Sequence, residues 1–175
     1  MASTKAHHAT GWAAGLGAAA LAAQAGNTGP YFLWTALTFL AGMAGATAPD
    51  WMEVAWWSRT QRLWVTHRTV THWGVGWIGM AWWSWTELAR QPMAAPLFGF
   101  ACGGIIHLLA DWPNPRGVPW LWHRHSLKLW KSGRCDWIIV GAAWMGAAAV
   151  ADHVWFHGLH SRWLVHYVKN GGWWA

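Results

Sequence analysis

The sequence predicts an all-α protein: a polytopic membrane helical bundle of four to five helices, followed by a C-terminal interfacial helix. Hydrophobic residues make up 55% of the 175 residues and charged residues only 10%, well below the usual quarter. Tryptophan occurs 21 times, and its ring prefers the membrane–water interface, where the indole N–H stays hydrated. Common hydropathy scales score tryptophan as mildly polar, so the mean hydropathy of +0.14 understates this character. Together with the long apolar runs, these observations favour a membrane protein over the alternative, a tryptophan-rich soluble domain.

Five apolar runs are the candidate spanning helices, and they cover residues 12–26, 31–48, 73–88, 95–110 and 137–151. Each is a little shorter than the roughly 20 residues that a spanning helix needs, and flanking Trp and Leu residues can extend it. The first and last runs are rich in Ala and Gly, which suits close helix packing better than contact with lipid. The first run has a second interpretation, because Lys5 and the segment Ala23-Gln24-Ala25 resemble a secretory signal and its cleavage site. A single lysine is a weak positive region, so we favour a retained helix.

We assign residues 1–152 to the helical bundle and residues 153–175 to an amphipathic tail. The positions of lysine and arginine predict how the bundle is oriented in the membrane. With the N-terminus inside, nine of the 12 Lys and Arg residues fall in inner segments. The positive-inside rule therefore predicts a multi-pass protein of the bacterial inner (cytoplasmic) membrane with a cytoplasmic N-terminus. The net charge of +6 then reflects topology and attraction to anionic lipid headgroups. The sequence has no nucleic-acid motif, so direct nucleic-acid binding is not expected.

The tail is expected to form an interfacial helix over residues 152–170. Its apolar side would carry Trp155, Phe156, Leu159, Trp163 and Leu164. His153, His157 and His160 follow the i, i+4, i+7 spacing of one helical face, which also suits metal ligands. Because Asp152 is the nearest carboxylate, we interpret this histidine set as the polar face of the interfacial helix.

The predicted orientation places four groups of polar residues at the inner ends of the helices. They are His7 and His8 before the first helix, Asp50 after the second, His67 and His72 at the start of the third, and His107 and Asp111 at the end of the fourth. Imidazole and carboxylate are the usual protein ligands of zinc, manganese and iron. We therefore predict a divalent metal site, with zinc favoured over manganese or iron. The candidate ligands are His7, Asp50, His67, His72, His107 and Asp111.

The pair His107 and Asp111 gives the strongest support to the predicted metal site. The two residues are four apart and share one face of a helix. An ionisable residue within an apolar run is a functional candidate by default. His67 and His72 are five apart, which separates them by about 140° on a straight helix. Both can be ligands only if the helix starts between them; otherwise one of them supports the site from outside it.

Catalysis would need further groups. Asp50 or Asp111 is the candidate general base, and Arg68 and Arg116 are the candidates that would offset the charge of a phosphate. The plain alternatives are a turn or helix cap for Asp50, a tail residue for His7, and simple topological charge for either arginine.

Several short motifs follow one another in the order of a known family. They are His7 four residues before Gly11, Pro49-Asp50, His67-Arg68 with Thr71-His72, Gly103 with His107 and Asp111, and Gly117-Val118-Pro119 with Ser126-Leu127. Over about residues 7–139 the chain thus resembles the YdjM-like family of inner-membrane metal-dependent hydrolases, some of which are described as LexA-binding. It departs from the family pattern at Met52, where a second Asp is expected and Glu53 stands next to it. Thr69 and Trp73 also replace a Gly and a Ser.

These observations lead to one hypothesis and two rivals. The hypothesis is a membrane-embedded metal-dependent hydrolase, in particular a phosphoesterase that acts on a lipid-linked or membrane-proximal substrate. The first rival, favoured by Met52 and the tryptophan content, is a non-catalytic, metal-stabilised membrane scaffold that binds a partner protein. The second is a metal transporter, ranked last because the second, third and fifth runs offer almost no polar residues for an ion pathway. The expected partners are the lipid bilayer, an anionic phospholipid or phosphoester substrate, and a partner protein.

Overall fold

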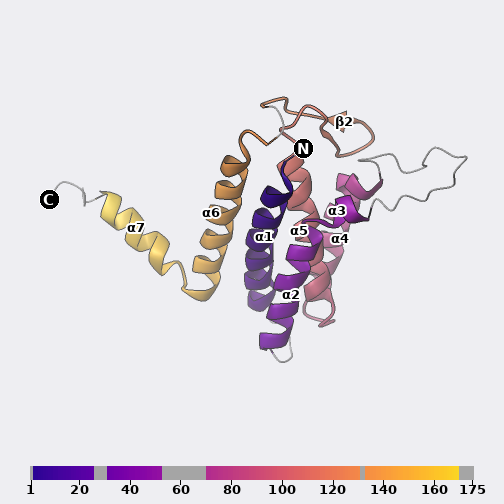
Figure 1. The fold of residues 1–175 in the computed structure, drawn as a ribbon. Coiled ribbons are helices and arrows are strands. Elements are labelled where there is room, and N and C mark those ends of the chain that lie inside the picture. The colour runs from indigo at the N-terminus through magenta and orange to yellow at the C-terminus, as the bar shows by residue number, and fades with distance from the viewer. Residues whose placement is uncertain (1, 26–30, 53–69, 131–132, 170–175) are drawn as a thin grey trace, which may run out of the picture.

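The apolar runs fold into helices in the computed structural model, which describes residues 2–25, 31–52, 70–130 and 133–169. In chain order the elements are α1 (Thr4–Gln24), α2 (Tyr31–Gly45), α3 (Ala48–Trp51), the 3₁₀ turn η1 (Val70–His72), α4 (Gly74–Glu87), α5 (Ala94–Asp111), α6 (Asp136–Trp155) and α7 (Leu159–Lys169). Between α5 and α6, the two-residue strands β1 (Val118–Pro119) and β2 (Arg124–His125) pair in an antiparallel hairpin. The predicted all-α class is confirmed (Figure 1).

The first helix begins well before the apolar run that predicted it. The side chain of Ser3 accepts a hydrogen bond from the backbone N–H of Ala6 and caps the helix. α1 therefore starts at Thr4 and includes His7 and His8, which were expected to precede it. The predicted start was too late because it rested on the apolar run, and the first turns of α1 contain mostly polar residues. The Ser3 cap is what begins the helix at Thr4.

Two of the described helices are candidate membrane spans. α5 with 18 residues and α6 with 20 residues are long and apolar enough to cross a membrane. α2 contains a shorter apolar segment, Phe32–Gly45. α4 has 14 residues, or about 21 Å of helix, against a hydrocarbon core of about 30 Å. The expectation of four to five spans is thus not established and stays a prediction.

Glycine lets α1, α2 and α5 approach one another closely. A Cβ on Gly11 of α1 would lie 2.8 Å from the Cβ of Ala46 after α2. A Cβ on Gly42 of α2 would lie 2.5 Å from the Cα of Gly15. A Cβ on Gly103 of α5 would collide with the carbonyl oxygen of Gly42. Larger residues do not fit here, so the three helices pack backbone against backbone and their registers are fixed.

The same helix faces lead, at intervals of four residues, into the polar end of the bundle. On α1 the series is Gly15, Gly11 and His7, and on α5 it is Gly99, Gly103, His107 and Asp111. Residues four apart share a helix face. The faces that bring α1 and α5 against α2 therefore also direct these polar side chains into the interface between the helices.

The polar residues gather at one end of the bundle, as predicted. In Figure 1 the start of α1, the end of α5, α3 and the β hairpin lie together, whereas the junction of α6 and α7 lies at the opposite end. α5 packs against α2, α1 and α4, and α6 packs mainly against α1. The junction of α6 and α7 is thus separated from the polar residues by the length of the bundle.

The prediction of one tail helix over residues 152–170 is wrong. α6 continues to Trp155, and the chain then turns at His157 (φ 52°) and Gly158 (φ 72°) before α7. The carboxylate of Asp152 caps α7 by accepting hydrogen bonds from the backbone N–H groups of His160 and Ser161. His153, His157 and His160 consequently lie on α6, the turn and α7, and do not share one helical face.

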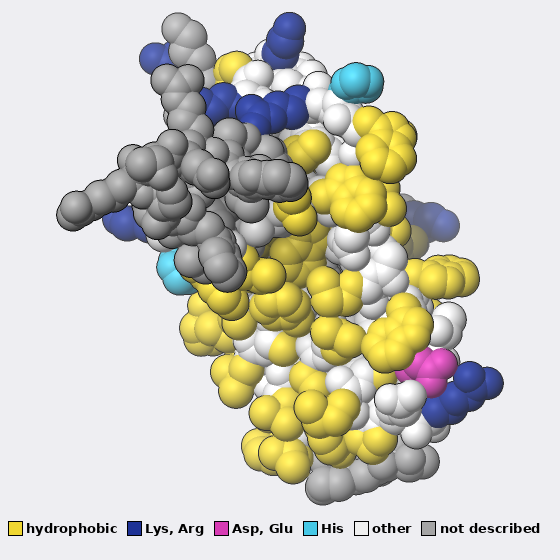
Figure 2. All heavy atoms as spheres, turned by 90° about the vertical axis from the view of Figure 1, so that its right-hand side faces the viewer, with side chains coloured by type: hydrophobic (Ala, Val, Ile, Leu, Met, Phe, Trp, Pro, Cys, Tyr) yellow, Lys and Arg dark blue, Asp and Glu magenta, His cyan; other side chains and the backbone are white. Residues whose placement is uncertain are grey.

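The outer face of α4 is apolar. Ile78, Trp82 and Trp83 are 50%, 71% and 50% exposed. Figure 2 shows hydrophobic side chains over most of the middle of this side of the molecule, with Lys and Arg side chains mainly towards its two ends. An apolar band between charged ends is the surface expected of a protein surrounded by lipid.

Candidate metal centre

Five polar side chains from four elements meet at one end of the bundle. His7 comes from α1, Asp50 from α3, His72 from η1, and His107 and Asp111 from the end of α5. The side chain of Asp50 is 35% exposed, and the other four residues are at most 2% exposed. A buried group of three imidazoles and two carboxylates needs hydrogen-bond partners or a cation to be stable.

Asp50, His72 and His107 form the first group of three. The Nε2 atoms of His72 and His107 lie 3.2 Å apart. Oδ1 of Asp50 lies 3.6 Å from Nε2 of His72 and 3.7 Å from Nε2 of His107. A tetrahedral zinc ion with bonds of about 2.0 Å would place neighbouring ligand atoms about 3.3 Å apart. The three atoms thus form a triangle close in size to one face of a zinc site.

The backbone after α2 fixes which nitrogen of His107 faces this group. Nδ1 of His107 lies 2.8 Å from the carbonyl oxygen of Ala46. A carbonyl oxygen only accepts, so Nδ1 carries the hydrogen and donates it. Nε2 is then left with a lone pair directed at His72 and Asp50. Metal-binding imidazoles commonly donate their other N–H to a backbone carbonyl in this way.

His7, His107 and Asp111 form a second group of three. Nε2 of His7 lies 3.6 Å from Oδ1 of Asp111, and Nε2 of His107 lies 3.9 Å from Oδ2 of the same carboxylate. The His7 and His107 rings are stacked, with centroids 3.9 Å apart. Oδ1 of Asp111 also accepts a hydrogen bond of 2.8 Å from the backbone N–H of Ala2. The start of the chain thus covers this side of the cluster.

Because the two groups share His107, they cannot both hold an ion through it. Nε2 of His107 has one lone pair, and Nδ1 is bonded to Ala46. The first group has the shorter separations from Nε2 of His107, at 3.2 and 3.7 Å against 3.9 Å to Asp111. The geometry therefore favours one ion on Asp50, His72 and His107, with His7 and Asp111 beside it.

Unpartnered polar atoms mark the same place. Both ring nitrogens of His7 and Oδ1 of Asp50 are buried without a hydrogen-bond partner among the described residues. Leaving such an atom unpaired costs about 1–3 kcal/mol. A divalent cation would satisfy carboxylate and imidazole atoms of this kind, so the residues present fit a metal ion.

Asp50 is the accessible member of the cluster. Burial raises the pKa of its carboxyl, whereas the imidazoles of His72, His107 and His7 lower that pKa, and the net direction is downward. Asp50 is therefore a carboxylate at neutral pH. Because the other four residues are buried, an ion or a substrate would approach the cluster past Asp50.

The chain matches a known protein family over almost its whole length. The family model described as YdjM inner membrane protein matches residues 1–169. The chain belongs to the YdjM inner membrane protein family. The resemblance inferred from the short motifs is thus confirmed over almost the whole chain. No curated protein and no solved structure matches it.

In this YdjM protein the structure brings together five of the six predicted ligands. The sixth, His67, lies outside the described residues, as do Arg68, Glu53 and Thr69. Whether the five residues bind metal, and whether Asp50 or Asp111 acts in catalysis, stays a prediction. The buried His/Asp group could hold an ion.

Other predicted residues lie at the edge of the cluster or away from it. Arg116 is exposed in the turn after α5 and does not belong to the cluster. His8 is exposed on α1. Met52, where the YdjM pattern has a second Asp, is 41% exposed at the end of α3. Trp73 replaces the expected Ser, and its indole N–H donates to the carbonyl oxygen of Leu121 in the hairpin.

Sequence reasoning missed the backbone groups that orient the cluster. The carbonyl of Ala46 fixes His107, and the N–H of Ala2 binds Asp111. Neither group leaves a mark in the sequence. The four-residue glycine series on α1 and α5 was the available signal, because it places His7 and His107 on the faces that pack against α2.

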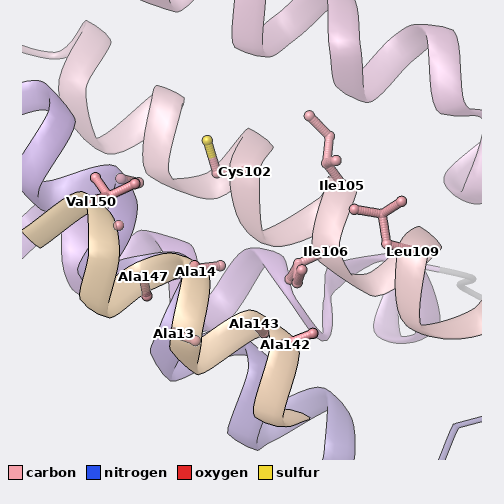
Figure 3. A pocket seen from close by; sticks show the side chains of 13 residues that line it. Ala13, Ala14, Cys102, Ile105, Ile106, Leu109, Ala142, Ala143, Ala147 and Val150 are labelled. Atoms are coloured by element: carbon pink, nitrogen blue, oxygen red, sulfur yellow. The ribbon is translucent and has the colours of Figure 1, made fainter. Parts of the chain in front are cut away.

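An apolar groove of about 340 Å³ lies between α1, α5 and α6 (Figure 3). Its walls include Cys102, Ile105, Ile106 and Leu109 of α5 and Ala142, Ala143, Ala147 and Val150 of α6, and Ala13, Ala14, Gly17 and Ala18 of α1 form its floor. None of the five clustered residues lines it. The groove is therefore distinct from the candidate metal centre.

Proposed function

We propose that this YdjM protein is a membrane-embedded, metal-dependent hydrolase. The observation that carries the proposal is the triangle of Asp50, His72 and His107, whose ligand atoms lie 3.2–3.7 Å apart. A site with three protein ligands and one open position is typical of catalytic zinc, whereas four protein ligands are typical of structural zinc. We propose zinc as the ion, with manganese and iron as the alternatives.

The residues around the triangle have separate roles in this proposal. A divalent ion would supply Lewis-acid chemistry, namely the activation of water and the polarisation of a phosphoryl oxygen. Asp50, His72 and His107 would hold the ion, and the carbonyl of Ala46 would keep His107 in the required tautomer. Asp111 lies beside the triangle, and its Oδ2 is 3.9 Å from Nε2 of His107, farther than the atoms of Asp50 and His72. We propose Asp111 as the general base.

We propose a phosphoester in a lipid-linked or membrane-proximal molecule as the substrate. The basic loop after α5 supports this class, because Arg116, Arg124 and Lys128 are exposed beside the end of the helix that carries His107. Arginine can grip a phosphate with two hydrogen bonds. Arg116, and Arg68 outside the described residues, would offset the substrate charge. On the sequence argument, this end of the bundle would face the cytoplasm.

The test is a hydrolysis assay on detergent-purified protein loaded with zinc, manganese or iron. The substrates are p-nitrophenyl phosphate, bis-p-nitrophenyl phosphate and phosphatidic acid in mixed micelles. We expect metal-dependent product release by the wild type and by His157→Ala, and loss of at least 100-fold in His107→Ala. Turnover that is equal in both variants, or absent with all three metals and all three substrates, would contradict the proposal.

A second candidate function is a non-catalytic, metal-stabilised scaffold that binds a partner protein. Two observations favour it: Met52 stands where the family pattern has a carboxylate, and His72 and His107 are fully buried. A cobalt-substituted protein separates the two functions. A change in its visible spectrum on addition of inorganic phosphate would indicate an open coordination position, and a spectrum insensitive to phosphate would favour the scaffold.

A further inference from the structure

We propose that Trp77 of α4 is a positioning residue of the candidate metal centre, which holds two of its ligand-bearing segments, η1 and α5, in register. The inference rests on the proposed metal site and concerns how the site is kept in shape. Trp77 is 5% exposed and does not belong to the cluster itself. Its contacts reach Thr71, which precedes His72, and Gly104, which lies three residues before His107.

The first contact fixes the backbone of His72. The indole N–H of Trp77 donates a hydrogen bond of 2.7 Å to the carbonyl oxygen of Thr71. That carbonyl belongs to the peptide group that joins Thr71 to His72. A rotation of this peptide would displace the His72 ring, so the indole bond restrains the angle at which Nε2 of His72 faces His107. The 3₁₀ turn η1 is only three residues long, and its own hydrogen bonding offers little restraint.

The second contact fixes the position of α5 against α4. A Cβ added to Gly104 would collide with the six-membered ring of Trp77, so the indole lies directly on the helix backbone. The same ring lies 5.4 Å from the ring of Phe100, measured between centroids, and packs in one buried cluster with Leu108. Gly104 lies three residues before His107 on α5, so the indole packs against the helix close to this ligand.

The buried cluster that contains Trp77 also includes one residue of α3 and one residue of the hairpin. Ala48 and Val118 are fully buried members of the Trp77 cluster. Ala48 lies two residues before Asp50 and begins α3. One indole thus contacts the segments that carry His72 and His107, and it shares a buried cluster with the segment that carries Asp50. Groups that orient metal ligands in this way typically change metal affinity by 10–100-fold when removed.

A matched pair of variants separates the indole hydrogen bond from a general effect of losing tryptophan. Trp73 also donates its indole N–H to a backbone carbonyl, that of Leu121, at 2.8 Å, but at an exposed position. Trp77→Phe and Trp73→Phe therefore remove the same type of bond. A second pair acts through the ring: Gly104→Ala pushes a methyl group into the Trp77 indole, whereas Gly79→Ala on α4 has no neighbour within 4 Å.

The experiment measures zinc affinity of the four variants in detergent by competition with a chromophoric chelator, with helicity and thermal unfolding of the metal-free proteins alongside. We expect Trp77→Phe and Gly104→Ala to bind zinc 10–100-fold more weakly than the wild type, and Trp73→Phe and Gly79→Ala to stay within about threefold. A purely structural role would lower the unfolding temperature of the metal-free protein without this selective loss of affinity.

The outcomes distinguish this inference from the proposed function. Wild-type affinity in Trp77→Phe and Gly104→Ala, or equal losses in both members of each pair, would overturn the role of Trp77 and leave the metal centre standing. A wild-type protein that binds no zinc, manganese or iron would overturn the metal centre and this inference with it. If Trp77→Phe does not fold, Gly104→Ala against Gly79→Ala decides the question.

Discussion

Nε2 of His72 and Nε2 of His107 face each other at 3.2 Å, although 35 residues separate them in the chain. Since Nδ1 of His107 donates to Ala46, Nε2 of His107 can only accept, and in the absence of a cation His72 must donate to it. A cation would replace that hydrogen bond by two lone pairs directed at the ion. The two imidazole rings are therefore already oriented so that a metal ion could bind between them with little movement of either ring.

The pair favours one ion per chain, because His107 has a single lone pair to offer. We expect a zinc stoichiometry close to one. We expect His72→Phe to lower zinc affinity more than 100-fold and His7→Phe less than tenfold, because His7 lies beside the favoured triangle and a phenyl ring can keep its stacking on His107. Isothermal titration of detergent-purified protein measures both. Two ions per wild-type chain, or equal losses in the two variants, would contradict the single-ion account.

The packing of α5 on α2 should depend on Gly103. We expect Gly103→Ala to destabilise the protein by about 1–3 kcal/mol, because its Cβ would meet the carbonyl oxygen of Gly42. Gly141→Ala on α6 is the control: it has no neighbour within 4 Å and should be neutral or stabilising by up to about 1 kcal/mol. Thermal unfolding in detergent measures the difference, and equal effects in the two variants would argue against close packing at Gly103.

The cap of α7 should act independently of the polar end. Asp152→Ala removes the acceptor for the N–H groups of His160 and Ser161. We expect faster proteolysis at the turn of residues 156–158 and an unchanged zinc affinity, because the turn lies at the opposite end of the bundle (Figure 1). Limited proteolysis and a zinc titration test this. A loss of zinc affinity would show that the tail is coupled to the centre.

The orientation of the bundle is a separate prediction. The distribution of Lys and Arg predicts that the start of α1 and the α5–α6 loop are cytoplasmic and that α7 is on the other side. Fusions of green fluorescent protein and alkaline phosphatase after residue 134 and after residue 169 test it. We expect fluorescence only for the first position and phosphatase activity only for the second; the reverse pattern would invert the assignment.

The helices could be predicted from composition and apolar runs, because a long segment with few charged residues can be recognised directly in the sequence. The start of α1 and the break at His157 could not, since each depends on a local device: the Ser3 cap in one case and the left-handed turn before Gly158 in the other. The spacing i, i+4 predicted that His107 and Asp111 share a face. It also wrongly placed His153 and His157 on one continuous helix, because spacing carries no information about where a helix ends.

The sequence was sufficient to predict which residues belong to the candidate site. It was not sufficient to predict the distances and orientations of their side chains. His7, Asp50, His72, His107 and Asp111 all stand at helix ends that topology places together. Their relative positions depend on the glycine contacts of α1, α2 and α5. The tautomer of His107 depends on a backbone carbonyl, which pattern reasoning does not address.

Metal analysis of the detergent-purified protein tests whether the His/Asp cluster holds an ion. We compare the wild type, the double variant His107→Ala with Asp111→Ala, and His157→Ala, which lies outside the cluster and serves as the control. We expect nearly one zinc, manganese or iron ion per chain in the wild type and in His157→Ala, and none in the double variant. Metal retained in the double variant, or metal absent from the wild type after reloading, would contradict it.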